Sequence, residues 1–558
     1  MRLTYRHDPS GNRLPSLAAI VALYLVLALP YVLWPLDPQP DERRYSIAAV
    51  EMIASGDYLV PLSETGELRL KKPPLTYYYV AAGFALLGET LAGAKLFFLV
   101  SATVIVMLVY SLGRALGASV LAATLGAAMM VGNRLFFTTS TQYIPDMPLV
   151  LGITAALIGF VHVLRGTARP WHIYLAWTGI AWAVLAKGFL ALLMLPIYAV
   201  VRWLPGTPAI GPSLRRHEVI AAILAFLLGG SWFALLAYWH FDELIAQFFG
   251  DQVTGKVKFD WRAVLAGISK TSRSLFILSL PGLLALAIAR IAAGRDVNKR
   301  RLREAAIVFL SLWIVLNIVI FAFSRQVYGR YALPAAPALM ALSAAYASLL
   351  PVDALANGLR RAMRILLPLL AVIVLLGSLI GLLFGAVGWG IAGVMVAIVG
   401  LPLLWRALAA RPLLAGIAAV ALFFPGVELA KLPIAHAVLF PTEGQVAAAR
   451  IAQLDPADRV LIVHKHAQLI DRIGVELRDF ARLDYAVTLP EPPDVAMIIF
   501  YNSDLREPLQ RAGYRIDSTP VANEILIEPK EIWALIALRD ATALRKAIGI
   551  PLFFATQP

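Results

Sequence analysis

Acidic residues stand directly beside long apolar segments at two places in the sequence. Asp41 and Glu42 follow a proline in PQPDERRYS, and Asp146 lies between two prolines in STQYIPDMP. Acids in the first turn of a helix gain about 0.3–1 kcal/mol from the helix dipole, which would account for Asp41 and Glu42 without any function. An ionisable group at a membrane boundary, as Asp146 would be, is costly unless it is paired or used. The three acids are therefore candidates for a catalytic site.

Basic residues occur near the same apolar segments. Lys187 is the sharpest example, because it lies in AKGFL between two apolar runs with almost no loop around it. A lysine that extends from a helix end to the lipid headgroups is the alternative explanation for that single residue. Several such cations on one side of a membrane would instead bind an anion of the bilayer, such as a phospholipid or a polyprenyl phosphate. The cations in question are Arg43, Arg44, Arg69, Lys71, Lys72, Arg134, Lys187, Arg325 and Arg330.

The composition identifies a membrane protein. Of the 558 residues, 60% are hydrophobic and only 15% are charged, which leaves too little polar surface for a soluble chain. The net charge of +14 does not indicate nucleic-acid binding, because lysine and arginine form short clusters between apolar runs, as in membrane topology. The chain has no cysteine, and hence no disulfide and no thiolate nucleophile. The basic segment Met1 to Arg13 precedes a long apolar run without a cleavage site, so we expect a retained first span.

Thirteen apolar runs approach the roughly 20 residues that a membrane-spanning helix needs. A further stretch, Pro73–Leu87, is short, opens with two prolines and carries three consecutive tyrosines. If this stretch does not cross, the loops rich in arginine all fall on the side of the basic N-terminus, as the positive-inside rule requires. We therefore expect Pro73–Leu87 to be a juxtamembrane helix with its tyrosines at headgroup level. The expected spans lie near residues 15–35, 96–113, 117–131, 147–164, 171–186, 188–204, 217–239, 271–293, 304–323, 331–350, 363–384, 387–405 and 411–428.

The first outer loop in this topology, residues 36–95, is long and carries both signs of charge. Apolar residues with helical spacing predict a helix that begins after Pro40 and lies with one apolar face on the bilayer. This face comprises Tyr45, Ala48, Ala49, Met52 and Ile53. The acids of the loop would then occupy the first turn of an interfacial helix, with Tyr45 beside them.

The composition changes at about residue 429, after which the chain is charged and contains both strand-like and helical patterns. We expect residues 1–428 to form the membrane domain and residues 429–558 a small soluble α/β domain on the outer face. His464 and His466 share one strand face, but surface residues of this kind are more common than metal ligands. The expected strands are Val460–Val463, Ala496–Phe500, Ile525–Ile527 and Trp533–Leu538, and the expected helices are Glu443–Leu454 and Asp504–Ala512.

Together these motifs resemble a known family of membrane enzymes. The acid pair after the first span, KKPPLTYYY at the end of the same loop, Asp146 in the second outer loop, and SRQVYGRYALPAAP (residues 324–337) look like the membrane glycosyltransferases of the C-type fold. Within this fold the pattern is similar to protein O-mannosyltransferases and, more closely, to the lipid A aminoarabinose transferases of Gram-negative bacteria. The resemblance covers the whole chain, and the set of motifs in this order is more specific than the acid pair alone.

The resemblance implies a substrate pair and a location. The donor would be undecaprenyl phosphate carrying 4-amino-4-deoxy-L-arabinose, and the acceptor a phosphate group of lipid A. Transfer would take place at the periplasmic face of the bacterial inner membrane and would give resistance to cationic antimicrobial peptides such as polymyxin. The sugar follows from the resemblance alone, since composition and spacing do not indicate it.

The resemblance also suggests roles for the charged residues. Asp41 and Asp146 would face the sugar and its oxocarbenium-like centre, and Glu42 would belong to the same catalytic group. A phosphate acceptor is already anionic and needs no general base, so Asp41 is either a base or a positioning group. The donor phosphate would be bound by Lys71 and Lys187, with Arg44, Arg325 and Lys72 as helpers. Tyr331 would lie near that phosphate and Tyr45 near the acids; for both tyrosines, a position in the aromatic belt of the membrane is the alternative.

Direct attack by the acceptor opposite the leaving phosphate would invert the anomeric centre in one step. We expect no cofactor: a divalent metal is compatible with the acids of the first loop, but the nearby cations can supply the same positive charge, so none is required. We expect a monomer surrounded by membrane lipids.

Three other functions fit part of the pattern. A polyprenyl-phosphate-mannose-dependent protein O-mannosyltransferase would use a similar site. A transporter or flippase for anionic lipids would also need outward cations, but such proteins usually contain internal repeats and broken helices at mid-membrane, which the sequence does not show. A structural scaffold explains neither the long first outer loop nor Asp146.

Overall fold

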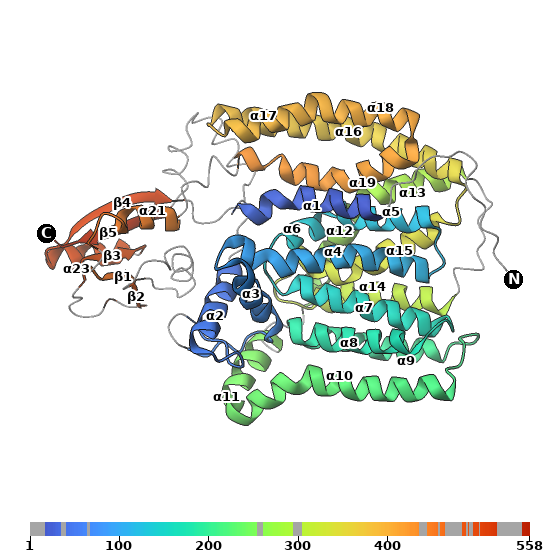
Figure 1. Cartoon of the computed structure of the whole chain (residues 1–558), viewed down its shortest axis with the longest axis horizontal. Helices are drawn as coiled ribbons and strands as arrows, with labels where there is room; N and C mark the ends of the chain where they lie inside the picture. Colours follow the sequence, from blue (N-terminus) through green and yellow to red (C-terminus); the bar gives the residue numbers. More distant parts are fainter. Residues whose placement is uncertain are drawn as a thin grey trace.

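The protein is described by a computed structural model that covers residues 17–34, 41–63, 67–253, 260–293, 304–434, 443–455, 458–463, 483–486, 489, 495–501, 503–521 and 550–557. Long helices that run side by side form most of the molecule, and a small sheet lies beyond one end of this bundle (Figure 1). The helices of the first part are α1 (Leu17–Leu33), α2 (Glu42–Ser55), α3 (Leu75–Leu87), α4 (Leu91–Ala115), α5 (Val120–Val131), α6 (Arg134–Ser140), α7 (Asp146–Leu164), α8 (Pro170–Lys187), η1 (Phe189–Leu193) and α9 (Met194–Arg202).

The second part of the bundle contains longer helices and several local breaks. Its elements are α10 (Pro212–Trp239), α11 (Phe241–Leu244), η2 (Ile245–Val253), α12 (Trp261–Phe276), η4 (Ile277–Ser279), α13 (Leu280–Ala292), α14 (Ala305–Ala322), η6 (Gly329–Ala335), α15 (Ala336–Ala347), α16 (Val352–Leu383), α17 (Val387–Met395), η7 (Val396–Gly400), α18 (Leu401–Ala410) and α19 (Pro412–Leu429). The segments η1, η4 and η6 are 3-10 helices, whereas η2 and η7 are π-helical.

Among the described residues, eight helices are long and apolar enough to cross a membrane. A ninth is obtained if α5 and α6, which meet at a bend of 62°, count as one broken span. All thirteen apolar runs expected from the sequence lie on helices, but several are shorter than a full span or broken, such as α1, the η1–α9 pair and the η6–α15 pair. A polytopic membrane protein is therefore confirmed, whereas the number of thirteen crossings stays a prediction.

Helix α7 is buried along almost its whole length in the middle of the bundle. It packs closely on α8, because a Cβ atom on Gly152 would lie 2.5 Å from the carbonyl oxygen of Gly179. Such close approach of two helix backbones needs residues without a side chain, as is common between helices in membranes. The packing fixes the two helix ends that carry Asp146 and Lys187.

Helices α2 and α3 lie together at the end of the bundle that faces the sheet (Figure 1). The predicted start of α2 directly after Asp41 is confirmed. The expectation that its apolar face rests on lipid is wrong for most of that face: Tyr45, Ala48, Ala49 and Met52 are buried in the protein core, and the Tyr45 ring packs 5.3 Å from that of Tyr77 on α3. Helix α3 satisfies this apolar face, so that only Ile53 of the predicted set is exposed.

The C-terminal part contains a five-stranded mixed sheet. Strands β1 (Val460–Val463), β2 (Leu483–Ala486) and β3 (Met497–Phe500) are parallel, whereas β5 (Ile550–Thr556) runs antiparallel to both β3 and β4 (Arg515–Val521). The order across the sheet is β2-β1-β3-β5-β4. Helix α21 (Glu443–Ile451), the short η8 (Ser503–Leu505) and α23 (Arg506–Arg511) accompany it.

Two of the four predicted strands, at Val460–Val463 and Ala496–Phe500, and both predicted helices are found in this region. The other two predicted strands, together with His464 and His466, lie outside the described residues. Strands β2, β4 and β5 were not predicted from the sequence.

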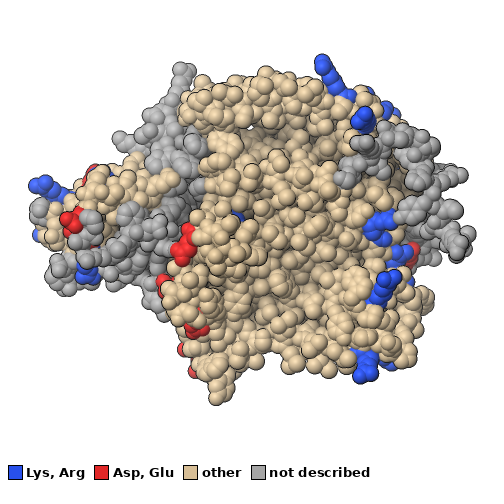
Figure 2. Space-filling view, in the orientation of Figure 1, with Lys and Arg blue, Asp and Glu red and all other residues tan. Residues whose placement is uncertain are grey.

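The two ends of the helical bundle differ in charge. On the face drawn in Figure 2, lysine and arginine gather at one end, and aspartate and glutamate at the end that carries α2, α3 and α11. The loops and helix ends opposite α2 and α3 contain Arg114, Arg165, Arg169, Arg202, Arg215, Arg216, Arg290, Arg360, Arg361, Arg364, Arg406 and Arg411. This asymmetry is the one that the positive-inside rule uses to orient a membrane protein.

Candidate functional site

Asp41 is held by two arginines from distant parts of the chain. Its Oδ1 atom lies 3.2 Å from Nη1 of Arg44, one turn further along α2, and its Oδ2 atom lies 3.3 Å from Nη2 of Arg330 in η6. Asp41 directly precedes α2, but its side chain forms no capping hydrogen bond with the helix. A capping hydrogen bond therefore does not account for Asp41, whose carboxylate is the counterion of Arg44 and Arg330.

Asp146 forms a buried ion pair with Lys187. The Nζ atom of Lys187 donates to Oδ1 of Asp146 at 2.7 Å, and the two side chains are 15% and 3% exposed. Lys187 is the last residue of α8, and Gly188 follows with a φ of +95°, a conformation that only glycine adopts without strain. This turn ends α8 at Lys187 and lets the chain leave in a new direction, so that the lysine points to Asp146 at the start of α7.

Aromatic rings surround this pair and the neighbouring arginine. The Nζ atom of Lys187 lies 5.3 Å from the centre of the Tyr331 ring, and the guanidinium of Arg330 lies 5.0 Å from that of Tyr328. The Tyr331 ring is stacked on Phe321 at 4.6 Å. Cations above aromatic faces are stabilised by the ring quadrupole, so the tyrosines help to hold the cations of the site in place.

Arg330 links the two carboxylates electrostatically. Burial alone would lower the pKa of its guanidinium, but the nearby Asp146 and Asp41 raise it. Lys72 of the first loop also acts on Asp146. Arg44, Arg330, Lys187 and Lys72 thus act on the carboxylates of Asp41 and Asp146, and this surplus of positive charge around the two carboxylates suits a phosphate group.

Tyr45 lies behind the acids and is completely buried. Burial raises the pKa of its phenol well above the usual value, and the neighbouring Tyr77 and Asp41 act in the same direction. The phenol of Tyr45 is therefore neutral at physiological pH. It can donate a hydrogen bond but cannot act as a base.

Glu42 has a structural partner. Its Oε1 atom accepts a hydrogen bond of 2.9 Å from the backbone N–H of Tyr143, and the residue is only 3% exposed. Tyr143 belongs to the segment that leads from α6 to Asp146. The carboxylate of Glu42 thus ties the start of α2 to this segment, which is a positioning role. The catalytic role predicted from the sequence stays a prediction.

The end of the first loop is fixed by helices further along the chain. The side chain of Gln247 accepts a hydrogen bond of 2.9 Å from the backbone of Leu70 and donates one of 3.0 Å to the carbonyl of Leu68. The indole of Trp232 donates to the carbonyl of Leu59 at 3.0 Å. These contacts hold the basic end of the loop, which includes Lys72, on the same side of the bundle as Asp41.

The structure brings together most of the residues that the sequence singled out: Asp41, Glu42, Arg44, Tyr45, Lys72, Asp146, Lys187 and Tyr331. Lys71 and Arg325 are exposed, and their contribution to phosphate binding stays a prediction. Arg330 was missing from the predicted set, and so was Arg69, which acts on Tyr45 and Tyr77. Both were recognised only as outer cations. The sequence motif SRQVYGRY contains both Arg325 and Arg330, so it could have indicated Arg330 as well.

No group of three or more histidine, cysteine, aspartate or glutamate side chains that could hold a metal ion occurs within the described ranges. The donors nearest to the two carboxylates of the site are instead lysine and arginine. A binding site for an anion fits these residues better than a binding site for a cation.

Comparison with known proteins finds glycosyltransferases among those that this chain is similar to. Residues 14–245 match the family of dolichyl-phosphate-mannose-protein mannosyltransferases. The chain is 28% identical over 350 residues to undecaprenyl phosphate-alpha-4-amino-4-deoxy-L-arabinose arabinosyl transferase 1 of Sodalis glossinidius, and this match covers 58% of the chain and 57% of that protein. It is 27% identical over 358 residues to arabinosyl transferase 2 of Proteus mirabilis, over 60% of both proteins. The chain thus spans less than two thirds of these relatives.

The fold is that of a solved protein. The crystal structure of ArnT from Cupriavidus metallidurans bound to undecaprenyl phosphate superposes with a TM-score of 0.66 over 96% of this chain and 97% of that one, at 17% identity. The structure of the same protein in the apo state also gives 0.66. These matches confirm the resemblance that the motifs indicated, and they confirm a polytopic helical fold of this type. The thirteen spans and the soluble C-terminal domain stay predictions.

Proposed function

We propose that this chain is an inverting glycosyltransferase that moves 4-amino-4-deoxy-L-arabinose from undecaprenyl phosphate to a phosphate group of lipid A. The observation that carries the proposal is the buried Asp146–Lys187 pair together with Asp41, which pairs with Arg44 and Arg330. The names of the curated relatives at 27–28% identity support this donor. The fold shared with ArnT supports a bundle that can hold a polyprenyl chain.

The charges of the site suit this reaction. As the bond between the anomeric carbon and the donor phosphate breaks, the electron pair goes to undecaprenyl phosphate, and Lys187 and Arg330 stabilise the negative charge that grows there. Asp41 and Asp146 face the sugar ring, where positive charge develops. They also keep the cations oriented before the donor binds.

The acceptor needs no base. An oxygen of the lipid A phosphate is already anionic at neutral pH, so it can form the new bond to the anomeric carbon without losing a proton. Attack from the side opposite the leaving group inverts the anomeric centre, and no nucleophile of the protein takes part. Asp41 then acts as a positioning group for the sugar or its amino group.

The charge asymmetry of the bundle supports a periplasmic site. We assign the end rich in arginine to the cytoplasm, so that α2, α3 and the site lie in the periplasm. With thirteen spans, residues 429–558 would form a soluble α/β domain on the same side, where Figure 1 shows the sheet. The protein would act as a monomer in the inner membrane and would increase resistance to polymyxin.

Transfer to protein is the second candidate function, because residues 14–245 match the protein mannosyltransferases. Purified protein incubated with radiolabelled donor and either lipid A or a Ser/Thr peptide separates the two. Label on lipid A supports aminoarabinose transfer, and label on the peptide, with a mannosyl donor, supports O-mannosylation. No transfer from either donor would contradict an enzymatic function and leave lipid transport as the explanation.

A further inference from the structure

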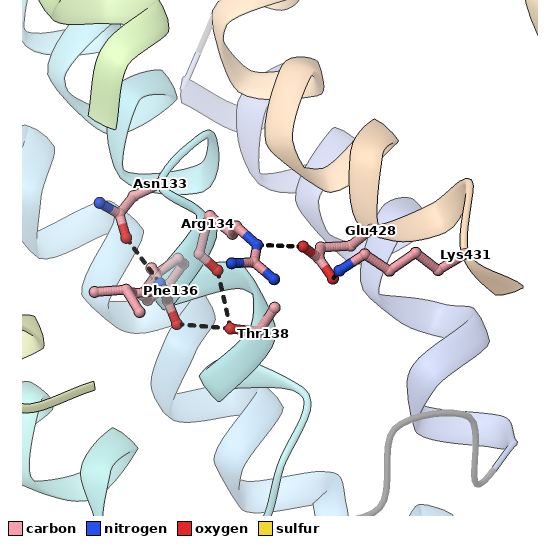
Figure 3. Close-up of polar contacts among 7 residues, drawn as sticks. Asn133, Arg134, Phe136, Thr138, Glu428 and Lys431 are labelled. Carbon is pink, nitrogen blue, oxygen red and sulfur yellow. Dashed lines mark hydrogen bonds and ion pairs between the residues drawn. The ribbon is translucent and has the colours of Figure 1, made fainter. Parts of the chain in front are cut away.

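A second charged group lies between α6 and α19, outside the site of Asp41 and Asp146 (Figure 3). Nε of Arg134 donates to Oε1 of Glu428, and Nζ of Lys431 donates to Oε2 of the same carboxylate at 2.7 Å. The side chain of Glu428 is only 7% exposed, whereas those of Arg134 and Lys431 are 39% and 44% exposed. The carboxylate therefore lies behind the cations, and the cations reach the surface.

Helix stability does not explain these positions. Arg134 is the first residue of α6 and Glu428 is the last residue but one of α19. A cation at a helix N-terminus and an anion at a helix C-terminus both oppose the helix dipole. Each residue thus needs the other as a counterion, and another reason is required for a cation at the start of α6.

The group carries a surplus positive charge. Two cations share one carboxylate, and Arg134 uses only its Nε atom for that contact. Within the part of the chain that the structure describes, its Nη1 and Nη2 atoms have no hydrogen-bond partner, and the contact drawn in Figure 3 between Arg134 and Glu428 is that of Nε alone. A guanidinium that is held through Nε can still donate hydrogen bonds from Nη1 and Nη2, and this pair of donors is well suited to a phosphate.

Arg134 is held in place by the break between α5 and α6. Oδ1 of Asn133 accepts a hydrogen bond from the backbone N–H of Phe136 at 2.8 Å, and its Nδ2 donates to Ser279 Oγ at 2.8 Å. The hydroxyl of Thr138 donates to the carbonyl of Arg134 at 3.0 Å. These bonds fix the direction of α6, so the guanidinium is oriented before any ligand arrives.

The start of α6 also borders the candidate active site. A Cβ atom on Gly329 would lie 3.4 Å from Cδ2 of Leu135, the residue after Arg134. Gly329 directly precedes Arg330, which pairs with Asp41. A phosphate-bearing lipid at Arg134 and Lys431 would therefore lie beside the site in which the sugar is transferred.

We propose that Arg134 and Lys431, oriented by Glu428, bind a phosphate of the acceptor lipid headgroup. The identification of this lipid as the acceptor rests on the proposed function, whereas the recognition of a lipid phosphate does not. Glu428 is a positioning residue, because it holds the two cations and is itself covered.

Binding of lipid A to the purified full chain, measured in neutral detergent by native mass spectrometry without any donor, tests the proposal. Lipid A and dephosphorylated lipid A are compared for the wild type, the neutral variant R134Q/K431Q and the charge-preserving variant R134K/K431R. The matched control is R262Q, which removes an exposed arginine at the start of α12. Melting curves show whether each variant is folded.

The wild type should bind lipid A about 10- to 100-fold more tightly than the dephosphorylated form, as expected for charge-assisted hydrogen bonds. R134Q/K431Q should lose this preference, whereas R134K/K431R and R262Q should keep most of it. An unchanged preference in R134Q/K431Q would overturn the proposal. So would equal binding of both lipids by the wild type, a result that does not depend on the folding of any variant.

One further measurement distinguishes a lipid headgroup from a free phosphate ion as the ligand. A second distinguishes failure of the lipid-phosphate site from failure of the proposed sugar transfer. If inorganic phosphate displaces lipid A as effectively as excess lipid A does, the group binds a free ion, and the assignment to a headgroup is wrong. In transfer assays, R134Q/K431Q should raise the KM for lipid A and leave the KM for the donor unchanged. Phosphate-dependent binding of lipid A by a wild type that transfers no sugar would support the headgroup site and contradict the proposed function.

Discussion

Nζ of Lys187 lies 2.7 Å from Oδ1 of Asp146 and so joins the last residue of α8 to the first residue of α7. Both side chains are largely removed from solvent, and no long loop separates either residue from its apolar helix. Each is the counterion that makes burial of the other tolerable. The pair is therefore part of the fold and, in our account, of the reaction.

These two roles can be separated by single and double substitutions. Asp146→Asn leaves Lys187 as a buried unpaired cation and should destabilise the protein by about 3–5 kcal/mol. The double variant D146N/K187M removes both charges and should regain much of this stability. Sugar transfer should stay undetectable in both. Melting curves measure the stability of each variant, and transfer assays measure its activity. Sugar transfer by D146N/K187M would show that the pair is only structural.

Arg330 should be essential for transfer, because it contacts Asp41 and acts on Asp146. Arg330→Gln should lower kcat by about 10²–10³, as found when one electrostatic donor to a transition state is lost. Arg330→Lys keeps the positive charge but loses the paired N–H donors of the guanidinium, so it should recover only part of the rate. The matched control K270Q, an exposed lysine on α12, should behave as the wild type. Equal rates for wild type and R330Q would remove Arg330 from the site.

Glu42 distinguishes a positioning role from a catalytic one. Glu42→Gln keeps an oxygen that can accept from the N–H of Tyr143, so its rate of transfer should stay within a few fold of the wild type. Glu42→Ala leaves this N–H without its partner, which should cost about 1–3 kcal/mol of stability and lower the rate. If E42Q is as inactive as E42A, the negative charge of Glu42 itself is needed.

Metal removal tests the role of the cations. Because lysine and arginine surround the carboxylates of the site, transfer should not change after treatment with EDTA and dialysis. Addition of Mg²⁺ or Mn²⁺ to the treated protein serves as the control. A loss of activity with EDTA that either ion restores would contradict a metal-independent reaction.

The sequence was sufficient to identify Asp146 and Lys187, because an ionisable residue at the end of an apolar run is visible without a structure. It singled out Arg325 for the donor phosphate, whereas the structure places Arg330 against Asp41. The two arginines are five residues apart in one outer segment, and only the 3-10 turn of η6 directs Arg330 to Asp41. The contact of Glu42 with the backbone of Tyr143 was equally inaccessible, since it joins residues 101 positions apart.

The position of α2 shows a similar limit. The spacing of Tyr45, Ala48, Ala49 and Met52 correctly predicted one apolar face, but a helical pattern does not reveal whether lipid or protein covers it. In the sheet, β4 was missed because most of its residues are polar and only Val521 is buried. The strand is stabilised by pairing with β5 near the end of the chain.

The most direct test of the central claim is transfer of radiolabelled 4-amino-4-deoxy-L-arabinose from undecaprenyl phosphate to lipid A by the purified protein. We predict that label appears on lipid A with the wild type and with K270Q, and not with D146N/K187M. Absence of label on lipid A with folded wild-type protein, or equal labelling by D146N/K187M, would contradict the account.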